Sequence, residues 1–136
     1  MAEKRKKTSG LGTPVNVLWE NVLMIPLFGT VDSSRAQEIL ETVLTKVIET
    51  GSKTIILDIL GVVTMDSGVA NHLIKIVKGC KLLGCQAVIS GISVEIAQTL
   101  INLGVDLGEI DTTSTLKDAI ELTFDKIGLE VVEVKD

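Results

Sequence analysis

The tripeptide Asp66-Ser67-Gly68 places a hydroxyl between a carboxylate and a glycine, directly before a segment with helical periodicity. A serine at a helix start can cap the helix by accepting a backbone hydrogen bond. If the hydroxyl is exposed, it can instead be phosphorylated or act as a nucleophile. The glycine beside it leaves room for another chain to approach. Local chemistry alone favours the helix cap as the interpretation of this tripeptide.

A catalytic use of Ser67 requires a base within hydrogen-bond reach of its hydroxyl. The single histidine, His72, lies five residues further along the same helix, about 140° around it at roughly 100° per residue. Asp58 and Asp66 could pair as acid and base, but Asp58 falls in an apolar segment where a structural hydrogen-bonding role is expected. We therefore predict no catalytic residue and no enzymatic activity, with a hydrolase that uses Ser67 kept as an alternative.

The sequence also predicts neither a metal nor a cofactor. Cys80, Cys85 and His72 are too scattered to form a metal-ligand set. Segment 104–108, Gly-Val-Asp-Leu-Gly, lacks the spacing and the lysine of a phosphate-binding loop. Two cysteines fit a reducing compartment better than a disulfide framework. Since no secretory or membrane-spanning segment is evident, we expect a cytoplasmic protein without a membrane partner.

The elements that must position Ser67 are a strand before it and a helix after it. Residues 55–60 form an apolar, β-branched run, typical of a strand buried on both faces. After Ser67, apolar residues recur at helical spacing up to Gly84, which is expected to end the helix. These positions are Val69, Ala70, Leu73, Ile74, Val77 and Cys80.

On the N-terminal side, runs 15–19 and 22–28 predict a hairpin with Asn21 in the turn. Pro26 is expected to face an unpaired position or a bulge. A helix capped by Asp32 or Ser33 should follow and end at Gly51.

On the C-terminal side, the predicted elements are a strand at 87–90, a helix at 94–103 capped by Ser93, and a brief edge strand at Ile110. Ser114 is expected to cap a last helix. Strands that alternate with helices indicate an α/β fold with a mixed, mostly parallel sheet and about four helices, beginning with an antiparallel hairpin. We assign 1–13 to a flexible basic lead, 14–128 to one domain, and 129–136 to a C-terminal tail.

The charge distribution argues against a nucleic-acid partner. The net charge is −5, and residues 4–7 alone supply four basic side chains, so the rest of the chain is more acidic still. Aromatic residues make up only 2%, which leaves no platform for stacking bases. The basic run is interpreted as a solubilising lead.

A buried strand, a glycine-containing loop and then Asp66-Ser67-Gly68 opening a helix resemble the phosphorylation-site signature of STAS domains, the anti-sigma-factor antagonist fold. Segments 69–73, 82–84, 91–100 and 103–104 narrow the resemblance to the C-terminal domain of RsbR-type stressosome proteins. The similarity covers roughly residues 15–128.

The resemblance implies that Ser67 is the main phosphorylation site and that Asp66, Gly68 and Asn71 contact the partner. The implied partner is a switch serine/threonine kinase or an anti-sigma factor, in control of stress-response sigma-factor signalling. Other STAS proteins of the RsbR or RsbS type, in a homodimer or a larger assembly, are also implied. Thr99 aligns with a second site, although a threonine within a helix can instead bond a backbone carbonyl.

Two features depart from the RsbR pattern. The first site is a serine, as in RsbS-type proteins, where RsbR-type domains carry threonine. The sequence also contains no counterpart of the sensory domain of a full RsbR, which fits either a stand-alone domain or a chain whose sensor has been removed. A ligand-binding or transporter-associated STAS domain without a kinase partner therefore remains the alternative function.

Overall fold

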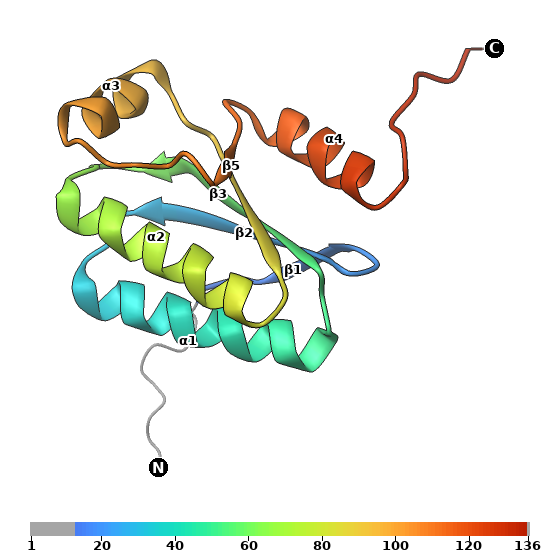
Figure 1. Cartoon of the computed structure of the whole chain (residues 1–136), viewed down its shortest axis with the longest axis horizontal. Helices are drawn as coiled ribbons and strands as arrows, with labels where there is room; N and C mark the ends of the chain where they lie inside the picture. The colour runs from blue at the N-terminus through green and yellow to red at the C-terminus, as the bar shows by residue number, and fades with distance from the viewer. Residues whose placement is uncertain (1–12, 136) are drawn as a thin grey trace.

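The computed structural model describes residues 13–135, which form one five-stranded sheet with four helices. The strands are β1 (Asn16–Trp19), β2 (Val22–Gly29), β3 (Thr54–Val62), β4 (Gln86–Ser90) and β5 (Asp111–Thr112). The helices are α1 (Ser33–Thr50), α2 (Ser67–Leu82), α3 (Val94–Asn102) and α4 (Leu116–Lys126). The chain alternates as predicted, and the sheet keeps sequence order from β1 to β5 (Figure 1).

The sheet is mixed, as the sequence predicts. β1 and β2 pair antiparallel, and Asn21 takes a positive φ of 64° in the turn between them. All other neighbours pair parallel. The ladder between β2 and β3 changes register between Pro26 and Phe28, which is the irregularity expected where proline cannot donate a hydrogen bond.

Helices cover both faces of the sheet. α1 and α2 lie side by side against one face, where alternate β3 residues Ile55, Leu57 and Ile59 enter the main core (Figure 1). α4 covers part of the opposite face, where Ile56 and Val88 pack with Ala119. The first part of β3 is thus buried on both faces, as its predominantly apolar sequence predicts.

Four local details correct the predictions. β3 extends from Thr54 to Val62, beyond the expected 55–60, and the edge strand is Asp111–Thr112, one residue after Ile110. The cap of α4 is Thr115, whose hydroxyl accepts from the Asp118 amide at 3.0 Å, and so Ser114 lies outside the helix. In α2 the residue buried in the core is Ile76 and not the predicted Ile74, which is only half-buried. The buried positions shift gradually around the helix along its length.

Candidate functional site

Ser67 is the first residue of α2, and Asp66 is the residue that caps the helix. The Asp66 carboxylate accepts from the Val69 amide at 2.8 Å. Asp66, Ser67 and Gly68 are all exposed. Within residues 13–135 the Ser67 hydroxyl has no hydrogen-bond partner, so it does not serve as the cap. The side chain is therefore available to another molecule.

Gly68 leaves space beside Asp66 and Ser67 because it has no side chain. A Cβ at position 68 would lie 3.3 Å from Asp66 Oδ1, which is tighter than an ordinary contact. A larger residue would therefore press on the capping carboxylate. Asn71 lies one turn further along α2 and is exposed, so it shares the approach to Ser67.

The helix start has an electrostatic preference of its own. The free amides and the dipole of α2 favour an anion at this end by about 0.3–1 kcal/mol. Asp66 opposes an added negative charge by a comparable amount. A phosphate on Ser67 would therefore leave the stability of the fold nearly unchanged.

No base stands ready to activate Ser67 among the residues that the structure describes. His72 Nε2 lies 3.2 Å from the Ser33 hydroxyl of α1 and so pairs with another serine. Asp58 accepts from the Ser90 hydroxyl at 3.1 Å and the Leu60 amide at 3.3 Å, the structural role expected for it. In the same part of the chain, no three histidine, cysteine or acidic side chains gather in a way that would hold a metal ion.

Thr99 lies on α3, half-buried. Its hydroxyl donates to the Glu95 carbonyl at 2.9 Å, the backbone bond that a helical threonine commonly makes. A kinase would have to break this bond to modify Thr99, whereas Ser67 has no such bond to break within residues 13–135.

A groove runs from Ser67 along α2, and no pattern in the sequence signals it. Its volume is about 560 Å³, and it lies between α2 and the loop that leads to β5. Its walls carry apolar side chains together with charges of both signs, from Ser67, Asn71, Ile74, Val77, Lys78, Lys81, Asp106, Glu109 and Ile110. Helical periodicity places Ile74 in the core, and only the tertiary structure shows it at this surface.

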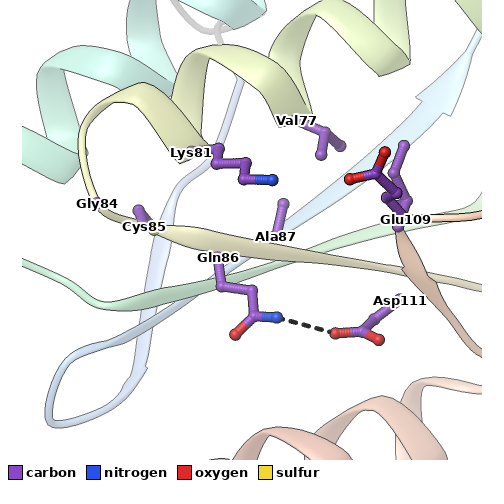
Figure 2. Close-up of a pocket in the computed structure, with 9 residues that line it drawn as sticks. Val77, Lys81, Gly84, Cys85, Gln86, Ala87, Glu109 and Asp111 are labelled. Atoms are coloured by element: carbon purple, nitrogen blue, oxygen red, sulfur yellow. Dashed lines mark hydrogen bonds between the residues drawn. The ribbon is translucent and has the colours of Figure 1, made fainter.

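A second cavity, of about 300 Å³, lies beyond the far end of the groove, where β4 begins. Figure 2 shows Lys81 and Glu109 extending toward one another across it. Gln86 Nε2 donates to Asp111 at 3.1 Å and links β4 to β5 at its floor (Figure 2).

Exposed apolar side chains gather at the carboxyl ends of β2 and β3, the same edge of the sheet from which the chain enters α2. Phe28, Leu60 and Val63 are 54%, 72% and 71% exposed. The Val63 amide donates to the Gly29 carbonyl, which holds the two strand ends together. Apolar side chains on a monomer surface mark a contact surface when they cluster. The sequence could not separate these residues from core strand residues.

The family model of the STAS domain matches residues 14–119. The chain belongs to the STAS family. The RsbT co-antagonist protein RsbRA of Bacillus subtilis (strain 168) is 36% identical over 124 residues, which is 91% of this chain and 45% of that protein. This STAS chain thus spans less than half the length of the RsbT co-antagonist relatives that it matches.

Solved structures agree on the fold. A variant of RsbS from Moorella thermoacetica superimposes with a TM-score of 0.72 at 24% identity, covering 85% of this chain and 97% of that one. The anti-sigma factor antagonist SpoIIAA in its unphosphorylated form gives 0.67 at 17% identity, covering 90% and 100%. The predicted STAS architecture is thereby confirmed. Within residues 13–135, no helix combines the length and the apolar character needed to cross a bilayer.

Proposed function

We propose that this STAS domain is a phosphorylation-switched interaction module, a stressosome scaffold or anti-sigma-factor antagonist without enzymatic activity. A switch serine/threonine kinase binds the surface around Ser67 and phosphorylates the hydroxyl. The single observation that carries this proposal is that Asp66 caps α2 and leaves Ser67 exposed and, within residues 13–135, unbonded. The similarity to RsbT co-antagonist proteins supports the class of partner.

The surface around Ser67 offers what a protein partner requires. Asp66, Gly68 and Asn71 flank the hydroxyl, and the apolar cluster of Phe28, Leu60 and Val63 lies at the same edge of the sheet. Burying a doubly charged phosphate in such an interface, without a basic group opposite, costs several kcal/mol. Phosphorylation therefore weakens binding to the partner and leaves the stability of the fold nearly unchanged.

The test is mass spectrometry after incubation with ATP and the switch kinases of the same genome. We expect phosphate on Ser67 and none in the Ser67→Ala variant. Ser33→Ala is the matched control, because Ser33 follows the cap Asp32 just as Ser67 follows Asp66. Ser33→Ala should be modified like the unchanged chain. A competent kinase that leaves Ser67 unmodified would refute the proposal.

A second experiment measures the consequence of the charge. Ser67→Asp should weaken kinase binding about tenfold or more, since 1.4 kcal/mol corresponds to a factor of about ten. The melting temperature should move by less than about 3 °C, because the competing terms at the helix start are below about 1 kcal/mol. Ser33→Asp should leave binding unchanged. Equal binding by Ser67→Asp and the unchanged chain would count against the switch.

The alternative is a STAS domain that binds a small ligand and has no kinase partner. The cavity at the start of β4, with Lys81 and Glu109 across it, favours this alternative. A small molecule that raises the melting temperature, and loses that effect in Lys81→Ala, would bring it forward.

A further inference from the structure

The turn at the C-terminal end of α2 brings the positions of Cys80 and Cys85 together. Gly84 takes a φ of 79°, and its amide donates to the Lys81 carbonyl at 3.0 Å. The Cys85 amide donates to the Cys80 carbonyl at 2.9 Å. These two bonds define a Schellman motif, which brings together the side chains at its first and last positions, here Cys80 and Cys85.

Two other helices end in the same motif, and they show what normally fills these positions. In α3 the Val105 amide donates to Leu100, and in α4 the Leu129 amide donates to Phe124. Both pairs are apolar, which is the usual contact across this motif. In α2 the same two positions hold both cysteines of the chain. The turn after α2 therefore places two thiols side by side, whereas the turns after α3 and α4 place two hydrocarbon side chains there.

The two thiols differ in acidity. A hydrogen bond with Cys85, followed by burial, raises the pKa of the Cys80 thiol above its ordinary value. The same hydrogen bond lowers the pKa of Cys85; burial opposes this effect, and the nearby Lys53 ammonium adds to it. Of the two sulfurs, Cys85 is thus the one that loses its proton more readily, and the thiolate is the form that reacts with oxidants.

Both cysteines are buried, but Cys85 borders a cavity large enough to hold a small oxidant next to it. Cys85 lines the cavity of about 300 Å³ at the start of β4, between the end of α2 and β5 (Figure 2). Hydrogen peroxide is about the size of one or two water molecules and fits this volume.

We propose that Cys80 and Cys85 form an oxidation site, which a hydroperoxide entering this cavity closes to an intramolecular disulfide. The Cys85 thiolate attacks one peroxide oxygen, the O–O bond breaks, and the departing hydroxide takes a proton to become water. Cys85 is left as a sulfenic acid. Cys80 then attacks that sulfur, loses its proton and expels hydroxide as a second water. Two thiols are oxidised by two electrons, and one hydrogen peroxide is reduced to two waters.

The proposal is independent of phosphorylation, and its test needs only the unchanged full chain. After treatment with hydrogen peroxide, we expect the intact mass to fall by two hydrogen atoms. The alkylatable thiols of the unfolded chain should fall from two to none, and dithiothreitol should restore both. Two thiols that stay free, a disulfide between chains, or oxidation beyond the sulfenic level would each overturn the proposal.

The order of events is tested with single variants. In Cys80→Ala, dimedone should trap a sulfenic acid on Cys85, because the resolving thiol is missing. In Cys85→Ala, Cys80 should remain unlabelled at the same peroxide dose. Circular dichroism verifies that each variant is folded, and the thiol titration of the unchanged chain stands without them. Labelling of Cys80 with Cys85 unlabelled would refute the assigned roles.

Discussion

Two helix starts in this chain share one arrangement, and the difference between them singles out Ser67. α1 begins with the cap Asp32 and then Ser33, while α2 begins with the cap Asp66 and then Ser67. The Ser33 hydroxyl is engaged with His72, whereas that of Ser67 has no partner among residues 13–135. The available serine is therefore defined by contacts and not by its local sequence.

The two capping aspartates, Asp66 and Asp32, should contribute similarly to stability but differ in their effect on Ser67. Asp66→Ala and Asp32→Ala should each lower the free energy of unfolding by about 1 kcal/mol, because each removes a side-chain bond of 2.8 Å to a helix amide. Urea denaturation measures this loss. Only Asp66→Ala should also change the rate at which the kinase modifies Ser67. A similar effect of Asp32→Ala on that rate would show that the change reflects general stability.

The sequence predicts the position of Ser67 at a helix start but leaves its role open. The cap interpretation and the modification interpretation differ only in which of two adjacent side chains reaches the Val69 amide. Contacts between distant segments are also beyond the reach of local sequence patterns. The bond between Ser33 and His72, for example, spans 39 residues.

At the scale of elements, the end of β4 is packed unusually closely against β3. Gly91 takes a φ of 82°, and a Cβ there would lie 2.5 Å from Asp58 Oδ1 and 2.6 Å from the Leu60 nitrogen. Asp58 is held in this corner by Ser90. Because Gly91 has no side chain, the carboxyl ends of β3 and β4, which precede α2 and α3, can pack directly against each other.

Gly91→Ala should be more destabilising than Gly51→Ala, although both glycines have positive φ. A methyl group on Gly51 would meet no other atom within 4 Å, so only the backbone conformation opposes alanine there, at about 1–2 kcal/mol. Gly91→Ala adds overpacking against Asp58 and Leu60, typically a further ~1–3 kcal/mol. Chemical denaturation of the two variants compares these losses. Equal losses would mean that the corner at Asp58 relaxes freely.

The sequence could predict the type and order of the elements because the periodicities are strong. Residues 55–60 are apolar except for Asp58, and the apolar residues of α1 recur at spacings of three and four. Element ends are harder to predict where neighbouring residues have similar chemistry. Ser114 and Thr115 can both cap a helix, and only the path of the backbone selects Thr115. The groove beside Ser67 could not be predicted, since it lies between segments that are distant in sequence.

At the scale of the whole molecule, the two faces of the sheet are covered unequally. α1 and α2 bury one face, while α4 covers a smaller cluster on the other. α4 is anchored at its far end by Phe124, whose ring meets Trp19 edge-on at 5.4 Å, and by Lys126, which pairs with Asp111 at 3.0 Å. After α4, residues 129–135 form neither helix nor strand and run away from the sheet (Figure 1).

Several of the last residues of the described chain are apolar but lie exposed. Val131, Val132 and Val134 are 52%, 63% and 84% exposed, so they contribute little to the core despite their apolar character. We propose that the folded unit is complete without them. Removal of residues 130–136 should leave the melting temperature within about 2 °C, because the Schellman bond from Leu129 to Phe124 is retained.

Phe124→Ala serves as the destabilised control for the truncated chain. It removes the aromatic contact with Trp19 and part of the packing of α4, and should cost about 1–3 kcal/mol. Thermal unfolding followed by circular dichroism should therefore separate the two variants clearly. A truncated chain that melts as early as Phe124→Ala would show that residues 130–136 pack on the domain. The exposed valines would then belong to the fold, and the boundary near residue 128 would be wrong.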